Sequence, residues 1–371
     1  MVIGVKCPKC GLMQMPREAC KSCGIPLDGA SPRLSPPPAQ PLPKTQWSPP
    51  EGGADLSQAR RLSFHGTGGS LFGIHIVNIL LTIITLGVYY FWGKVKTRSY
   101  ILSQTEFAGD RFAYHGTGKE LLIGFLKAVL VFGVPLGLLT AVRDLLDVGV
   151  VIKVVAGVLA YGLILVFIPL AMVGARRYRL SRTSWRGIRF SFRGPVMDFI
   201  KLFVRDSLLT AITLGLYYPI FETRRYAFMA SHSYSGNQKF HFDGRGRDLF
   251  GSFVLALLLN LPTLGLYWFW FLAKKQRYFW EHTSFGSASF RYRVTGGRLF
   301  LLKLGNLLLL LVTLGFGWPW VMVRNARFVF TYLSLEGPLD LEGIQQEAQV
   351  ASATGEGLAS FLDLDMGFGL G

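Results

Sequence analysis

The stretch that decides the fold is Thr85-Leu-Gly-Val-Tyr-Tyr-Phe-Trp92, which ends an apolar run and leads into the basic segment Gly93-Lys-Val-Lys-Thr-Arg-Ser-Tyr100. The tripeptide Thr-Leu-Gly recurs after three further apolar runs, each time before an aromatic cluster; these copies begin at Thr213, Thr263 and Thr313. Glycine readily adopts the backbone conformations that end a helix. The pattern therefore predicts internal repeats in which an apolar helix breaks at Thr-Leu-Gly.

A second motif, with aromatic residues at alternating positions, lies between these copies. It is clearest in Thr105-Glu-Phe-Ala-Gly-Asp-Arg-Phe-Ala-Tyr-His-Gly-Thr-Gly118, with partners that begin at Thr183, Tyr234 and Thr283 and a half copy from Leu62. Alternating aromatics on both sides of a glycine turn indicate short β-hairpins. The Gly-x-Gly that follows is a weak phosphate-loop signal, and we interpret it as a turn before a helix N-cap.

The composition indicates a membrane protein. Half of the residues are apolar and only 16% are charged, whereas soluble domains carry about 25% charge. Six apolar segments each reach the ~20 residues that a membrane-crossing helix needs; they span residues 71–92, 120–142, 150–174, 197–221, 249–272 and 299–323. We therefore predict a mainly α polytopic membrane protein built from internal repeats, each an apolar helix, a Thr-Leu-Gly break, an aromatic and basic segment and a short β-hairpin.

All four cysteines lie near the N-terminus, in two Cys-x-x-Cys pairs: Cys7, Cys10, Cys20 and Cys23. Two such pairs are typical of a tetrahedral structural zinc site. Disulfides are the alternative, but they need an oxidising compartment, and the N-terminal residues do not resemble a signal peptide. We therefore expect a small zinc ribbon with one structural zinc ion, similar to the short ribbons that begin many bacterial membrane proteins.

These features divide the chain into four parts. We predict a zinc ribbon over 1–24, a proline-rich linker over 25–61, a repeat-built membrane domain over 62–335 and an acidic, disordered tail over 336–371. The tail contains seven acidic residues and no lysine or arginine, a composition that disfavours a packed core.

The motifs of the membrane domain, in their order along the chain, resemble the YjgN-like family. The resemblance rests on Phe-x-Gly-x-Gly-x-x-Leu-Phe, then residues 85–100, then Thr-x-Phe-x-Gly-x-Arg-Phe-x-Tyr-x-Gly-Thr-Gly over 105–118. It implies a multi-pass protein of the bacterial inner membrane. That family consists of inner-membrane proteins of undetermined function, so the resemblance brings no catalytic residues with it, and no hydrolase, metalloprotease or P-loop motif is present. We expect no enzymatic activity.

The distribution of charge favours a lipid partner. The net charge is +17, and the basic residues flank apolar segments, where anionic headgroups of a bilayer explain them better than nucleic acid does. The number of crossings stays open, because the glycines of the Thr-Leu-Gly copies could instead make each segment a re-entrant hairpin, which needs a polar interior. Reduced cysteines favour a cytoplasmic N-terminus.

A stripe of polar residues shares fixed offsets from Thr-Leu-Gly. It consists of His75, Asn78, Thr82, Asp206, Thr210, Asn260, Lys303 and Asn306. These offsets fall on one helical face, and polar groups within a membrane tend to face a bundle interior or an aqueous path. One interpretation is a polar core of a transporter- or channel-like protein, with Asp206 the strongest candidate; the other is hydrogen bonding between packed helices.

Two functions follow from these alternatives. The protein is either transporter- or channel-like, with a polar intramembrane core, or a membrane-anchored scaffold that recruits cytosolic partners through its zinc ribbon and acidic tail.

Overall fold

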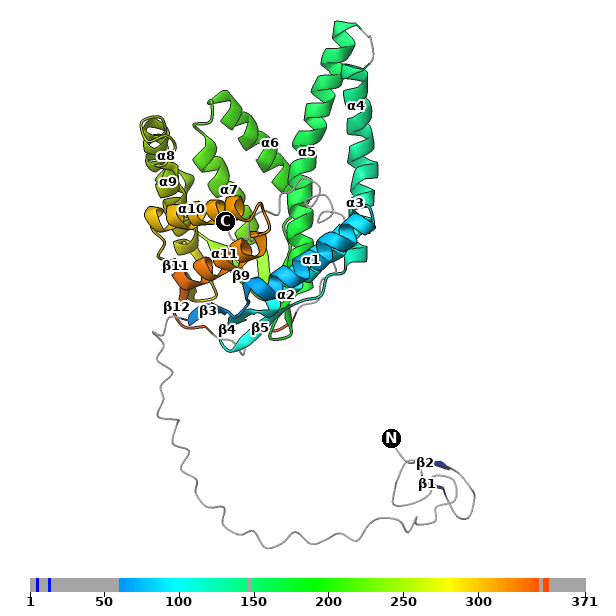
Figure 1. Ribbon diagram of the computed structural model, residues 1–371, viewed down its shortest axis with the longest axis vertical. Coiled ribbons are helices and arrows are strands. Elements are labelled where there is room, and N and C mark those ends of the chain that lie inside the picture. Colours follow the sequence, from blue (N-terminus) through cyan, green and yellow to red (C-terminus); the bar gives the residue numbers. More distant parts are fainter. Residues whose placement is uncertain (1–4, 7–12, 15–59, 146–148, 340–342, 347–371) are drawn as a thin grey trace. The chain divides into compact units, whose positions relative to one another are not determined.

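The computed structural model describes residues 5–6, 13–14, 60–145, 149–339 and 343–346 (Figure 1). The chain divides into two compact units, Met1–Ala54 and Asp55–Gly371. In the first unit, strands β1 (Val5–Lys6) and β2 (Met13–Gln14) pair antiparallel. The four cysteines of the predicted zinc site lie outside the described residues.

The helices of the second unit come in pairs that alternate with short strands. The first pair is α1 (Gly68–Ile84) with α2 (Tyr90–Ser103). In the second pair, α3 (Gly118–Ala128), η1 (Val129–Gly133) and α4 (Val134–Asp144) together face α5 (Val150–Arg182). The other pairs are α6 (Val196–Ile212) with α7 (Tyr218–Ser231), α8 (Gly246–Asn260) with α9 (Trp268–Glu281), and α10 (Gly296–Val312) with α11 (Trp318–Tyr332). The single π-helical turn η1 joins α3 and α4 into one long helix.

Ten short strands of this unit form a closed antiparallel barrel. They are β3 (Arg60–Phe64), β4 (Thr105–Phe107), β5 (Asp110–Tyr114), β6 (Thr183–Trp185), β7 (Ile188–Phe192), β8 (Ser233–Ser235), β9 (Gln238–Phe242), β10 (Thr283–Phe285), β11 (Ala288–Tyr292) and β12 (Leu333–Glu336). Each strand pairs with its neighbours in sequence, and β12 pairs with β3 to close the ring. Strands far apart in the sequence thus complete the barrel.

The alternating aromatic residues explain why the barrel holds together. Phe107, Trp185 and Leu335 are buried in one cluster with Ala288, and they come from strands that are not neighbours in the barrel, so their contacts run across its interior. The ring centroids of Phe107 and Trp185 are 5.3 Å apart. Leu339, which follows β12, packs on the same cluster, so side chains fill this part of the interior.

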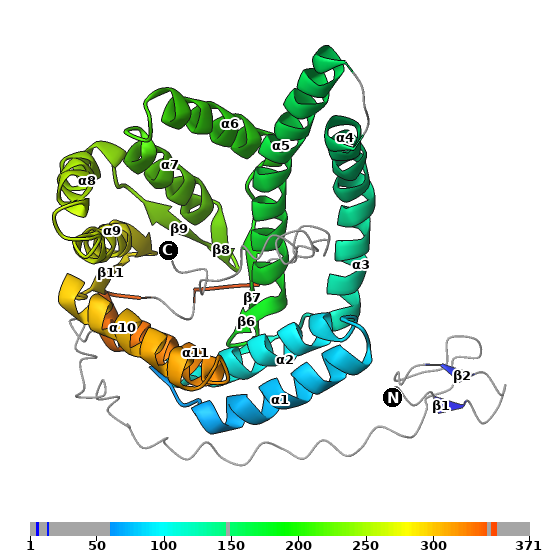
Figure 2. The same ribbon diagram turned by 45° about the horizontal axis from the view of Figure 1, so that its top comes forward.

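The helix pairs form a ring above the barrel (Figure 2), in which α11 packs against α1. Small residues at the helix starts allow this packing. A Cβ added at Gly296, in α10, would lie 2.5 Å from the Cγ of Trp270 in α9. Trp92 lies in the same way against Gly118, and Trp320 lies against Gly68. The glycine at each of these helix starts thus makes room for an aromatic ring of the preceding helix pair.

The fold differs from the predicted one, and the expectation of a mainly α polytopic membrane protein built from internal repeats is wrong. The second unit is organised around a closed ten-stranded barrel, and in the described part of the chain only two helical stretches, Gly118–Asp144 and Val150–Arg182, are long and apolar enough to cross a bilayer. Of the predicted zinc ribbon, the structure describes only the paired strands β1 and β2.

The physical reason lies in the Thr-Leu-Gly turns. They divide four of the six apolar segments into separate helices of 14–17 residues. Even 17 residues of α-helix extend only ~26 Å, less than the ~30 Å of hydrocarbon in a bilayer. The predicted hairpins, in turn, pair with one another instead of standing alone.

Candidate functional site

Four of the turns between paired helices contain a leucine and a glycine that both have positive φ. Their leucines have φ values of 48–49° and their glycines 81–93°; the leucines are Leu86, Leu214, Leu264 and Leu314. A left-handed conformation costs a non-glycine residue roughly 1–2 kcal/mol. All four leucine side chains are 87–95% exposed. Each turn therefore presents an apolar side chain at the end of its helix pair.

The threonine of each turn joins the two helices. The Thr85 hydroxyl donates to the carbonyl oxygen of Leu81 at 2.7 Å and accepts the backbone N–H of Tyr89 at 2.9 Å. Thr213 and Thr263 make the corresponding pairs of bonds. One side chain thus ends the first helix and caps the second.

Three predicted polar-core residues occupy the same position in three helix pairs, and each bonds within its own pair. The amide of Asn78 donates to the carbonyl oxygen of Gly93 at 3.2 Å, and that of Asn306 donates to Asn325 Oδ1 at 2.8 Å. Asp206 Oδ1 accepts from Arg205 Nε at 2.8 Å and from Arg224 Nη1 at 3.3 Å. All three side chains are buried.

The remaining residues of the stripe have different surroundings. Thr82 and Thr210 donate to the carbonyl oxygens of Asn78 and Asp206, one turn earlier in their helices. His75 and Asn260 are half-buried, and Lys303 is exposed. The structure therefore brings Asn78 together with Thr82, and Asp206 with Thr210. Within the described chain, no hydrogen bond joins the stripe residues of one helix pair to those of another.

Each of the three buried groups keeps one oxygen atom without a hydrogen-bond partner: Asn78 Oδ1, Asp206 Oδ2 and Asn306 Oδ1. A buried polar atom without a partner carries a desolvation cost of about 1–3 kcal/mol. The polar residue at this shared position therefore lowers the stability of each of the three helix pairs.

Sequence reasoning missed a second buried carboxylate, Glu222 in α7. It accepts from Arg225 at 2.7 Å and from Lys275 of the neighbouring pair at 3.1 Å. Because Glu222 occurs in only one of the pairs, no recurring pattern pointed to it. It ties α7 to α9 by an ion pair that is largely removed from water.

A cavity of about 390 Å³ lies between α7 and the start of α8. Its lining includes Arg224, Arg245, Arg247 and Asp248. Three guanidinium groups against one carboxylate make the cavity basic.

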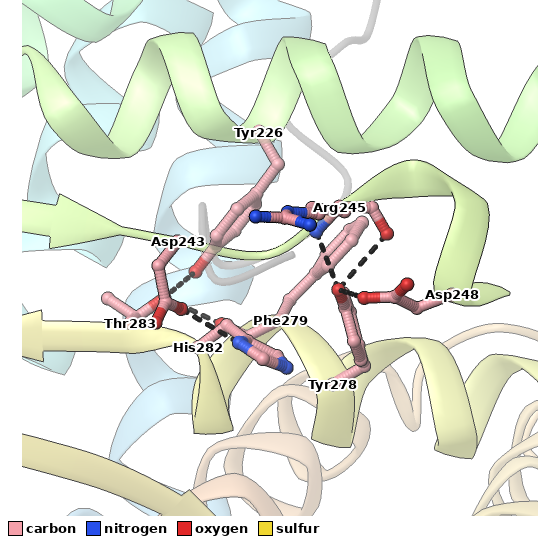
Figure 3. Close-up of polar contacts among 8 residues, drawn as sticks. All are labelled: Tyr226, Asp243, Arg245, Asp248, Tyr278, Phe279, His282 and Thr283. Carbon is pink, nitrogen blue, oxygen red and sulfur yellow. Dashed lines mark hydrogen bonds and ion pairs between the residues drawn. The ribbon is translucent and has the colours of Figure 1, made fainter.

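Hydrogen bonds beside this cavity join α8 and α9 (Figure 3). The Tyr278 hydroxyl accepts the backbone N–H of Arg245 and lies 2.6 Å from Asp248 Oδ2. Burial, and then the hydrogen bond to Asp248, raise the pKa of Tyr278 to about 12. Tyr100 contacts the backbone of Thr67 in the corresponding way in the first pair. Because the arrangement occurs in both pairs, it serves to hold the helices of a pair together.

Exposed leucines at the turns of four helix pairs form apolar surface of the kind that marks a membrane or protein contact. The family model described as "Bacterial protein of unknown function (DUF898)" matches residues 59–261, 238–301 and 263–361. The chain therefore belongs to this family.

Curated relatives agree with the YjgN-like resemblance. "Inner membrane protein YjgN" of Salmonella typhimurium (strain LT2) is 30% identical over 167 residues, which cover 42% of this chain and 40% of the relative. The protein of the same name in Escherichia coli (strain K12) is 36% identical over 152 residues, 41% of this chain and 36% of the relative. The chain thus matches about two fifths of the length of these relatives. No solved structure matches it.

The relatives are named inner membrane proteins. This chain is likewise a membrane protein of the bacterial inner membrane.

Proposed function

We propose that this protein is a membrane-anchored scaffold that holds two appendages, residues 1–59 and the acidic tail, on the cytoplasmic side. The observation that carries this proposal is the pairing of β3 with β12, in which Arg60 lies opposite Leu335. The linker enters the barrel at β3, and the tail leaves it at β12. The described tail residues continue across this end of the barrel, where the Gln345 backbone N–H donates to Asn237 Oδ1 at the β8–β9 turn. Both appendages therefore attach at the same end of the barrel.

The direction of these two strands supports the same conclusion. The far end of β3, at Phe64, leads into α1, and the start of β12, at Leu333, follows α11 directly. The appendages therefore begin at one end of the barrel and the helices at the other. If the exposed apolar turns enter the membrane, both attachment points lie at the end of the barrel that faces away from it.

The first appendage carries the predicted zinc site. The full-length protein purified in detergent is expected to contain one zinc ion per chain, because two Cys-x-x-Cys pairs supply four thiolates. Cys10→Ser is expected to lower the zinc content strongly. Metal analysis with thiol titration checks this, and purified protein with oxidised cysteines and little zinc would contradict it.

The orientation can be tested with reporters. A reporter inserted at Gln40 in the linker, and another at Gly109 in the β4–β5 turn, are both expected to report the cytoplasm. Turns between paired strands lie at the barrel end where the linker enters, since β3 and β4 are antiparallel. Alkaline phosphatase and green fluorescent protein fusions provide the measurement, with a fusion near Gly149, at the end of the long pair, as the comparison. A periplasmic signal from either of the first two sites would overturn the proposal.

Solute transport through a polar core is the second candidate. It is favoured by the unpartnered oxygen atoms of Asn78, Asp206 and Asn306, which could line a path if they faced a common interior. The filled part of the barrel interior supports the scaffold instead. Efficient cross-linking of cysteines introduced at positions 78 and 206 would favour transport.

A further inference from the structure

We propose that four exposed cations, Lys96, Arg224, Lys274 and Arg324, form a ring that binds the headgroups of anionic phospholipids while the leucine turns enter the hydrocarbon of one leaflet. This inference rests on one part of the proposed function, namely that the helix pairs face the membrane. It does not depend on the recruitment of a partner by the appendages.

The four cations occupy matched positions. Each stands nine residues after the glycine of its Thr-Leu-Gly turn, as Lys96 does after Gly87. Each lies in the second helix of a pair, and all four residues are exposed. This position is basic and exposed in all four helix pairs that contain a Thr-Leu-Gly turn, and we call these four cations the belt.

The distance from the turn to the belt fits one leaflet. In α2, Lys96 lies six positions after Tyr90, which at 1.5 Å per residue corresponds to about 9 Å along the helix. The hydrocarbon core of a bilayer is ~30 Å thick, so one leaflet contributes about 15 Å. A turn led by Leu86 can therefore enter the acyl chains while Lys96 stays among the headgroups.

Aromatic residues support the belt at this level. Lys96 Nζ donates to the Tyr89 hydroxyl at 2.6 Å, and Arg224 Nη1 donates to the Tyr217 hydroxyl at 2.9 Å. Tyrosine is enriched where hydrocarbon meets headgroups. These contacts join the cation of each of two pairs to an aromatic residue at the turn.

The local charge selects anionic partners. Within ten residues of the four turn glycines the sequence has only two acidic residues, Asp206 and Glu222. Both are buried and engaged in ion pairs. The surface around the turns therefore presents positive charge to the membrane, and phosphatidylglycerol offers the complementary headgroup.

The test compares two triple variants of the full-length protein in neutral detergent. One carries Lys96→Gln, Lys274→Gln and Arg324→Gln; Arg224 is left in place because it also pairs with buried Asp206. The control carries Arg111→Gln, Arg189→Gln and Lys239→Gln, three exposed cations of strands β5, β7 and β9. Binding of phosphatidylglycerol and of phosphatidylcholine with brominated acyl chains is measured by quenching of tryptophan fluorescence.

The first triple variant, the belt variant, is expected to bind phosphatidylglycerol roughly 100-fold more weakly than the wild type. The reason is that the loss of each of its three cations is expected to weaken binding about fivefold. Its affinity for phosphatidylcholine and the affinities of the control are expected to change less than twofold. The proposal is overturned if the belt variant keeps its affinity, or if the control loses as much. Should the belt variant misfold, Lys96→Gln alone must still weaken phosphatidylglycerol binding about fivefold. The reporter fusions test the orientation of the scaffold independently of lipid binding. A belt variant with unchanged lipid affinity would therefore overturn the belt proposal and leave the scaffold proposal to the reporter result.

Discussion

Gly296→Ala is expected to lower the free energy of unfolding by about 2–3 kcal/mol, whereas Gly297→Ala, one residue along the same helix, is expected to be neutral or stabilising by up to ~1 kcal/mol. The added Cβ at position 296 would lie 2.5 Å from Trp270 Cγ and 2.7 Å from Trp270 Cα. The second of these atoms belongs to the backbone, so a change of rotamer alone cannot relieve the contact. Position 297 has no heavy atom within 4 Å of an added Cβ.

Chemical denaturation in detergent, followed by tryptophan fluorescence, measures both variants. Gly68 and Gly69 provide an independent pair, because an added Cβ would clash with Trp320 at position 68 and meet open space at position 69. If Gly296→Ala were as stable as Gly297→Ala, and Gly68→Ala as stable as Gly69→Ala, the close packing between successive helix pairs would not be required for the fold.

The sequence alone predicted the local elements of the fold but not their assembly. The helix break at Thr-Leu-Gly follows from the backbone of a leucine and a glycine, and a hairpin such as β4–β5 follows from alternating aromatics around Gly109; both are short-range properties. The closure of the barrel depends on the pairing of Arg60 with Leu335. No composition or periodicity encodes a partner at that separation in the chain, and six long apolar runs favoured membrane crossings instead.

The polar stripe shows a related limit of sequence reasoning. A fixed offset from Thr-Leu-Gly places a residue at the same point within each helix pair, which is why Asn78, Asp206 and Asn306 are all buried against their partner helices. The offset contains no information on where one pair lies relative to the next. Matched positions therefore predicted that these residues have similar local surroundings. The prediction that they meet in a common polar core needed the further assumption that the helix pairs face one another.

The variant that combines Arg205→Ala with Arg224→Ala is expected to lose about 3–5 kcal/mol of stability, because it leaves a buried carboxylate without its cations. Asp206 is 0% exposed, and the two arginines that contact its Oδ1 atom are 58% and 47% exposed. The carboxylate is thus the desolvated member of this group. Its second oxygen has no partner that could compensate for the loss.

The opposite change is expected to be mild. Asp206→Asn should cost less than about 1 kcal/mol, because half-exposed arginines remain solvated when their partner becomes neutral. Adding Asp206→Asn to the double arginine variant should therefore restore most of its lost stability. A thermodynamic cycle of these variants thus measures the interaction between Asp206 and its two arginines. Lys303→Ala, which removes an exposed cation from α10, is the control and should change stability by under ~0.5 kcal/mol.

The outcome of this cycle distinguishes a packing role for Asp206 from a role in a polar path. A carboxylate that only links α6 to α7 needs its arginines, and its neutral amide can replace it once they are removed. A carboxylate that faces water would tolerate the loss of both arginines, since solvent would then stabilise its charge. A double arginine variant as stable as the wild type would therefore show that water reaches Asp206. That result would favour solute transport over the scaffold function.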